Sequence, residues 1–264
     1  MTGLSQLICA LFNVVALSSR KSLQLFLKTL QETGPAVTTE TTIARTWWTR
    51  GRPFTLPELI ADGVVHGIGI VVAVALGAVL LAFAGYETAP KELPALVLYV
   101  GSLLLVLSIS LAFNLCPIAS PAKRTLARLD QAAIFLFIAG TYTPFLVLLG
   151  ATPSSIIIGL LIWGAALTGM ALKLFVPHRF GRGAIVLYLG IGWSGVFVFQ
   201  ALASHLPGAS LWLLVAGGLC YSVGLIFHLW ERLTFHNAVW HGFVVAGASL
   251  HLVAVLDCMV ISRL

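Results

Sequence analysis

The stretch HNAVWHGFVVAGASLHLVAVLDCMV, residues 236–260, decides the fold. It begins with the polar side chains of His236, Asn237 and His241 and then continues almost wholly apolar. A helix needs about 20 mostly apolar residues to cross the hydrocarbon core of a bilayer. The stretch therefore predicts a membrane-spanning helix that carries imidazole and amide groups at one end.

The composition of the whole chain extends this prediction. Of 264 residues, 59% are hydrophobic and only 9% are charged, and the mean hydropathy is +1.01. A soluble domain of this size does not carry so much apolar surface. We predict an all-α integral membrane protein, a seven-transmembrane helical bundle with short connections. Its seven predicted spans lie near 63–85, 94–115, 131–149, 154–175, 183–203, 208–230 and 237–260.

The Lys and Arg residues predict the orientation of the bundle, because cytoplasmic loops retain positive charge. With seven spans, all but Lys91 and Arg263 of the 15 basic residues fall on one side. We therefore expect a cytoplasmic N-terminus. The basic residues are spread over loop ends without an aromatic-interleaved patch, so they do not indicate a nucleic-acid surface. Membrane lipids are the expected partners, no soluble partner is implied, and the oligomeric state stays open.

Residues 1–57 differ from the rest of the chain. They hold an apolar run too short to span a bilayer, followed by basic residues and a Thr-rich tract. We interpret 1–57 as an N-terminal tail, mobile or lying on the membrane surface, and 58–264 as the seven-helix domain. A true start further downstream is an alternative interpretation.

Polar residues inside the spans are the candidate functional residues, because ionisable groups at membrane depth are costly and usually face the bundle interior. With the predicted orientation, they all fall in the cytoplasmic third of the membrane. Several are four residues apart and share a helix face. The alternative is that these groups only hydrogen-bond helices to one another. The set consists of Glu58, Asp62, His66, Ser110, Asn114, Asp130, His236, Asn237 and His241.

Three stretches resemble a known family. They are RLDQAAIFLFIAGTYTPF (128–145), LKLF (172–175) followed by YLGIGW (188–193), and HNAVWHGFVVAGASLH (236–251). They are similar, in order and spacing, to the hemolysin III family, the bacterial branch of the progestin and adipoQ receptor (PAQR) superfamily, which includes the adiponectin receptors. The resemblance covers residues 56–260. It implies a multi-pass protein of the bacterial inner membrane with seven helices and a cytoplasmic N-terminus.

The resemblance also implies a zinc site near the cytoplasmic side. In the superfamily, the ligands are a His of a Ser-x-x-x-His motif and two His of a His-x-x-x-His motif, with an Asp close by. Here Ser110 matches the Ser, Asp130 the Asp and His241 the second His of span 7, whereas Asn114 and Asn237 replace the other two His. In the motif Glu-x-x-Asn-x-x-x-His of span 1, His66 matches the His.

The replaced residues weaken the case for zinc, because an amide oxygen is a poor substitute for imidazole. In the same span-1 motif Asp62 replaces the Asn, and Glu58 is displaced by one residue from the Glu. If zinc binds, we expect His241 and Asp130 as ligands, with Asn114 and Asn237 as weak partners.

Three functions stay open at this stage. The first is a non-catalytic or weakly catalytic regulator or sensor of membrane lipid state, with a polar site near the cytoplasmic side. The second is a metal-dependent hydrolase of lipid amides or esters, in which Asp130 orients or deprotonates a water and Ser110 stabilises the oxyanion. The third is a cytolytic protein, as the family name suggests. The sequence leaves open whether the protein is an enzyme.

Overall fold

A computed structural model describes residues 54–87, 92–117, 120–177 and 182–263. The proposed tail, residues 1–57, lies almost wholly outside these ranges. Within them the chain is all-helical, as predicted. The elements are α2 (Leu56–Glu87), α3 (Leu93–Leu115), α4 (Ala122–Leu148), α5 (Pro153–Phe175), α6 (Arg182–Trp193), η1 (Ser194–Val198), α7 (Phe199–His205), α8 (Gly208–Leu229), α9 (His236–Met259) and η2 (Ile261–Arg263).

Seven helical segments of the described chain are long and apolar enough to cross a membrane, which confirms the predicted number. Two of them start earlier than predicted: α2 begins at Leu56 instead of 63, and α4 at Ala122 instead of 131. Both extra segments contain charged residues, which lower the local hydropathy. Some of these charged groups are nevertheless buried, among them Glu58, Asp62 and Lys123.

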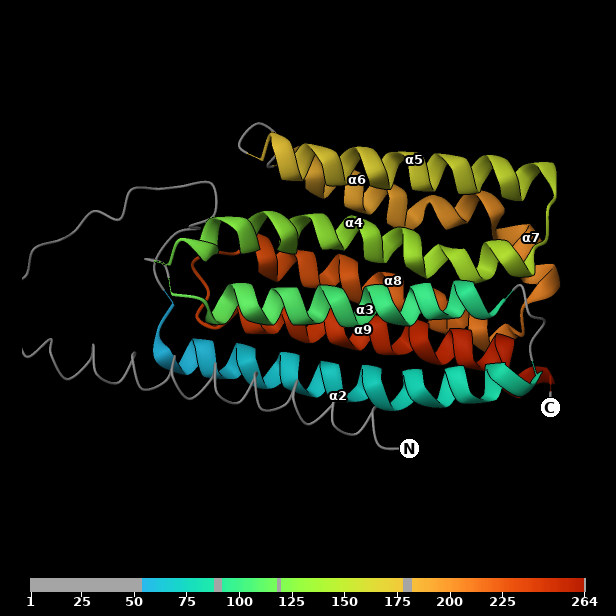
Figure 1. Cartoon of the computed structure of the whole chain (residues 1–264), viewed down its shortest axis with the longest axis horizontal. Helices are drawn as coiled ribbons and strands as arrows, with labels where there is room; N and C mark the ends of the chain where they lie inside the picture. The colour runs from blue at the N-terminus through green and yellow to red at the C-terminus, as the bar shows by residue number, and fades with distance from the viewer. Residues whose placement is uncertain (1–53, 88–91, 118–119, 178–181, 264) are drawn as a thin grey trace, which may run out of the picture. The chain divides into compact units, whose positions relative to one another are not determined.

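The spans are packed side by side in an up-and-down arrangement (Figure 1). Each helix contacts the next one in the order α2, α3, α4, α5, α6, α8 and α9, and α9 also contacts α2. We call the end where α2, α4, α6 and α9 begin the proximal end, and the opposite end the distal end. The α2–α9 contact is important for the site, because it joins the first and last described spans.

The most extensive helix contact, between α8 and α9, depends on small residues. A Cβ atom at Gly217 would collide with the ring of His251, and it would lie 3.0 Å from the carbonyl oxygen of Gly247. Small residues allow close approach of helices in lipid, where association relies on van der Waals packing and hydrogen bonds. Glycine at position 217 therefore fixes how closely α8 lies against α9.

The fifth span is broken near its middle into α6, η1 and α7. Tyr142 of α4 supports the break: its hydroxyl group donates to the carbonyl oxygens of Ile191 (3.0 Å) and Gly192 (2.6 Å) and accepts from the N–H of Gly195 (2.9 Å). Backbone groups at membrane depth must be satisfied within the protein. The tyrosine replaces helical hydrogen bonds that the break removes.

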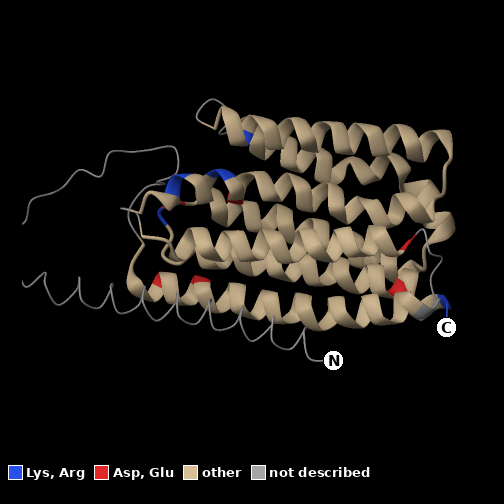
Figure 2. Ribbon diagram, viewed as in Figure 1, with Lys and Arg blue, Asp and Glu red and all other residues tan. Residues whose placement is uncertain are grey.

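Charged residues lie mainly at the two ends of the bundle (Figure 2). At the distal end, Arg263 forms an ion pair with Glu92 at 2.7 Å, which ties η2 to the start of α3. Ser210 donates to Asp257 at 2.6 Å and links α8 to α9 there. Most described basic residues belong instead to the proximal end: Lys123, Arg124, Arg128, Lys173 and Arg232.

Candidate functional site

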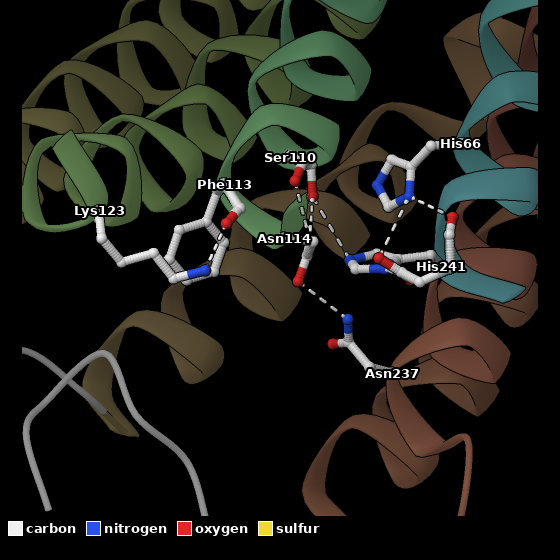
Figure 3. Close-up of polar contacts among 8 residues, drawn as sticks. His66, Ser110, Phe113, Asn114, Lys123, Asn237 and His241 are labelled. Carbon is white, nitrogen blue, oxygen red and sulfur yellow. Dashed lines mark hydrogen bonds and ion pairs between the residues drawn. The ribbon is translucent and has the colours of Figure 1, made fainter. Parts of the chain in front are cut away.

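A buried polar cluster lies between α2, α3 and α9 near the proximal end (Figure 3). Asp62 and His66 come from successive turns of α2, and both are buried. His241 comes from α9, and its side chain is 12% exposed. The Nδ1 atom of His241 lies 2.5 Å from Oδ1 of Asp62, and the two histidine rings are 4.3 Å apart between centroids.

Hydrogen bonds fix the tautomers of both histidines. His66 Nδ1 lies 2.9 Å from the backbone carbonyl oxygen of Asp62. A carbonyl oxygen only accepts, so Nδ1 of His66 carries the proton, and Nε2 keeps a lone pair when the ring is neutral. By the same reasoning, Nδ1 of His241 donates to the Asp62 carboxylate. Its Nε2 lies 3.5 Å from Oγ of Ser110.

Two buried atoms of this cluster have no hydrogen-bond partner among the described residues. They are Nε2 of His66 and Oδ2 of Asp62. A buried polar atom without a partner is costly and calls for an explanation such as a bound ion or water. Both atoms are of the type that coordinates metal ions, namely an imidazole nitrogen and a carboxylate oxygen.

An amide pair occupies the other side of the cluster. Asn237 of α9 donates from Nδ2 to Oδ1 of Asn114 on α3 at 3.1 Å. Asn114 in turn donates to the backbone carbonyl oxygen of Ser110 at 2.8 Å. These are the two positions where the resemblance implies histidine ligands. The two amides bind each other, so the side chains that could coordinate a metal are those of Asp62 and His66 on α2, together with His241.

Asp130 of α4 belongs to the same neighbourhood. Its carboxyl group interacts electrostatically with His241, and it also interacts with Ser110 and Asp62. It is not one of the three residues whose possible ligand atoms come together. Lys123 lies about two helical turns before Asp130 on α4. It donates to the carbonyl oxygen of Phe113, and its Nζ atom lies 4.1 Å from the centroid of the Phe113 ring.

Glu58 and His236 lie beside the cluster at the starts of α2 and α9. Glu58 accepts hydrogen bonds from the backbone N–H (2.9 Å) and hydroxyl (2.8 Å) of Thr55, and from the N–H of Phe235 at 3.0 Å. His236 packs its ring against Phe54, with 5.5 Å between centroids. Both side chains are buried and contribute to the joining of the two helix starts.

The cluster fits a metal ion. Asp62, His66 and His241 each offer one ligand atom, and these atoms all lie within 4.8 Å of one another. Two imidazoles and a carboxylate form a common zinc ligand set that leaves a fourth position open. The sequence predicts Asp62 and His66 in the polar layer and Asp130, with His241, as the ligands. The four-residue step from Asp62 to His66 was the available signal.

The fold and the cluster together define a class: a polytopic helical membrane protein with an internal polar site of histidine and carboxylate groups. Residues 54–252 match the family model described as haemolysin-III related. The chain belongs to this family. The predicted resemblance to the hemolysin III family is thus confirmed.

Curated relatives agree with this assignment. The chain is 35% identical to the "Hemolysin-3 homolog" of Bacillus subtilis, over 77% of this chain and 95% of the relative. It is 34% identical to "Hemolysin-3" of Bacillus cereus, over 75% of this chain and 90% of the relative. A human protein, "Monocyte to macrophage differentiation factor", is 29% identical over 48% of this chain and 52% of the relative, which supports the wider superfamily. No solved structure shows a significant match.

Proposed function

We propose that this protein regulates or senses the lipid state of the bacterial inner membrane through a divalent metal site beneath the cytoplasmic face. The observation that carries the proposal is the meeting of Asp62, His66 and His241, with ligand atoms within 4.8 Å of one another. Two of the cluster's buried atoms otherwise lack a hydrogen-bond partner among the described residues.

The charge distribution supports a cytoplasmic location for this site. The described basic residues belong mainly to the proximal end, where the cluster also lies, and cytoplasmic ends of spans retain Lys and Arg. By this rule the proximal end faces the cytoplasm and α2 begins there.

The position of the ligands supports a regulatory role. Asp62 and His66 are almost wholly enclosed, and only His241 is partly exposed. A zinc ion bound there would supply coordinate bonds that hold α2 to α9, the helix pair that joins the first and last described spans. Lipid that changes the packing of these two helices changes the geometry of the three ligands, which couples metal affinity to the state of the membrane.

A metal-dependent hydrolase of lipid amides or esters is the second candidate. One observation favours it: Asp130 interacts with both His241 and Ser110, which places an acid and a hydroxyl group beside the proposed metal site. Zinc with two His and one carboxylate activates a bound water in known hydrolases. Asp130 would then hold the proton of that water, and Ser110 would stabilise the oxyanion.

The names of the Bacillus relatives suggest cytolysis, but no specific contact of the described residues favours it.

Metal content tests the proposed site. We expect purified full-length protein to contain about one zinc ion per chain by elemental analysis, because two imidazoles and a carboxylate are available. His66→Ala and His241→Ala should each lower the zinc content at least tenfold. His205→Ala is the matched control, because His205 is an exposed histidine on α7 at the distal end, and it should keep the zinc. Equal zinc in all four proteins would refute the site.

The double variant Asn114→His with Asn237→His adds a second test of the ligand set. It restores imidazoles on the α3 side of the cluster, so zinc should then remain bound after His66→Ala is added. If the triple variant binds no zinc, imidazoles at positions 114 and 237 cannot replace His66, which contradicts the expected position of the metal between α2, α3 and α9.

Lipid hydrolysis separates the two candidate functions. The protein is placed in vesicles that contain a lipid amide or a lipid ester. If it is a regulator, it releases no fatty acid above a protein-free control. If it is a hydrolase, it releases fatty acid, and Asp130→Asn lowers the rate by a factor of about 10²–10⁴, the usual contribution of a general base. Measurable turnover lost in Asp130→Asn would replace the regulatory proposal with the enzymatic one.

A further inference from the structure

Three side chains of the polar cluster form a series of contacts that needs no metal (Figure 3). The carboxylate of Asp62 on α2 accepts from Nδ1 of His241 on α9 at 2.5 Å. On the other side of the same ring, Nε2 lies 3.5 Å from the hydroxyl oxygen of Ser110 on α3. With the proton on Nδ1, Nε2 keeps a lone pair that faces this hydroxyl group. The contacts therefore run from a carboxylate through an imidazole to a serine.

This order is that of a serine activated by a histidine, in which a carboxylate holds the imidazole in the tautomer that accepts the serine proton. The contact between base and nucleophile is about 2.6–3.2 Å in a reacting complex and is often longer without substrate, which fits the distance between His241 and Ser110. Asp62 and Ser110 are buried, so little water competes for the ring. Asp130 also interacts electrostatically with His241, so two carboxylates stabilise the positive charge that the ring gains with the proton.

An amide group lies beside the serine. Asn114 donates from Nδ2 to the carbonyl oxygen of Ser110 at 2.8 Å, and the same nitrogen lies 3.4 Å from the Ser110 hydroxyl oxygen. Asn237 holds this amide in place by donating to its Oδ1 atom at 3.1 Å. A side-chain amide can donate to the negatively charged oxygen that forms when a carbonyl group is attacked. The two asparagines that replace the expected metal ligands therefore suit a serine mechanism.

We propose that Ser110 is a nucleophile for the carbonyl carbon of a membrane lipid ester, with His241 as its base. As the Ser110 oxygen bonds to that carbon, its proton passes to Nε2 of His241, and Asn114 donates to the oxyanion. The bond from the carbon to the alcohol oxygen then breaks, and the alcohol leaves with the proton. Water, deprotonated by the same imidazole, hydrolyses the acyl-serine ester and releases the fatty acid. A lipid is the expected substrate because the site lies among membrane-spanning helices.

This reaction does not rest on the proposed metal site. A metal ion held by Asp62 and His241 would occupy the carboxylate or the ring nitrogen that the serine mechanism needs, so a single chain does not hold both states at once. The reaction therefore belongs to the metal-free protein. It continues in the presence of a chelator, whereas a metal-dependent hydrolase stops.

A fluorophosphonate probe with a long alkyl chain tests the nucleophile, because an activated serine displaces its fluoride and keeps the phosphonyl group. Full-length protein in detergent with excess chelator should gain one phosphonyl group per chain, located on Ser110 by peptide mass spectrometry. His241→Gln and Asp62→Asn should slow the labelling by a factor of about 10²–10⁴. Ser108→Ala is the matched control, because Ser108 is exposed on the same helix, and it should keep the original rate. No adduct, or an adduct on another residue, overturns the proposal.

Turnover gives a second measurement. In vesicles that contain a lipid ester, the chelated protein should release fatty acid, and Ser110→Ala should reduce the release to that of a protein-free control. Release that stops in chelator, or that persists in Ser110→Ala, overturns the proposal. The zinc content of the same samples before chelation reports on the metal site separately, so failure of one proposal is distinguished from failure of the other.

Discussion

Phe235, which precedes α9, has an unusual backbone conformation. Its φ of 61° places it in the left-handed region, which costs a residue other than glycine roughly 1 kcal/mol or more. The N–H of Phe235 donates to Glu58, and the same carboxylate accepts from Thr55 at the start of α2. Glu58 thus stabilises a strained turn and a helix start together, at the beginning of the helix that carries His241.

Removing the carboxylate of Glu58 should weaken both helix starts. We expect Glu58→Ala to lower the free energy of unfolding by about 1 kcal/mol, since the part-buried N–H groups of Thr55 and Phe235 lose their acceptor. Glu58→Gln keeps an acceptor oxygen and should lose less. Thermal unfolding in detergent measures both, and equal stability of Glu58→Ala and the unchanged protein would contradict this role.

Part of the site could be predicted at the residue scale. The four-residue steps from Asp62 to His66 and from Asn237 to His241 place each pair on one helix face, which follows from helix geometry alone. Which face meets which neighbour depends on the packing of helices far apart in sequence. The contact of Asp62 with His241 requires α2 to lie beside α9. No local pattern reports that adjacency, so the sequence alone predicts Asp130 beside His241 as a ligand and does not single out Asp62 and His66 from the rest of the polar layer.

The broken fifth span is the main departure from regularity at the scale of helices. Hydropathy predicted one uninterrupted span near 183–203, because the apolar character of the segment continues through the break. The 3-10 turn Ser194–Val198 instead divides it into α6 and α7. Tyr142 and Trp193 support the two sides of the break, the latter by donating from Nε1 to Oγ of Ser222 at 3.0 Å.

Tyr142→Phe should destabilise this break. The carbonyl oxygen of Gly192 and the N–H of Gly195 would lose their tyrosine partner at membrane depth, where water does not replace it, whereas the carbonyl oxygen of Ile191 keeps the hydroxyl group of Ser194. We expect a loss of about 1–3 kcal/mol and faster hydrogen exchange at Gly195. Thr168→Ala is the control, because the hydroxyl group of Thr168 bonds only within its own helix. Unaltered exchange at Gly195 in Tyr142→Phe would contradict the assignment.

At the scale of the whole molecule, the number of spans was predictable and their order around the bundle was not. Each crossing needs its own apolar segment, so hydropathy reveals it locally. Lipid solvates every apolar helix face equally well, so the same property says little about neighbours. The closing contact of α9 on α2 came only from the structure.

The predicted orientation gives a test of the whole topology. A reporter enzyme that is active only outside the cytoplasm should be active when fused after Leu264, because seven spans from a cytoplasmic N-terminus place the C-terminus outside. A fluorescent reporter that matures only in the cytoplasm should fluoresce when fused before Met1. The opposite pattern would invert the bundle and move the metal cluster to the outer face.

The partnership of Asp62 with His241 has a consequence for biosynthesis. The two residues are 179 positions apart, so the ribosome delivers the carboxylate to the translocation machinery long before its imidazole partner has been synthesised. Until α9 arrives, the carboxylate must stay hydrated, protonated or shielded by an insertion factor. Nascent chains that stall before residue 236 are therefore expected to be recognised as immature and degraded.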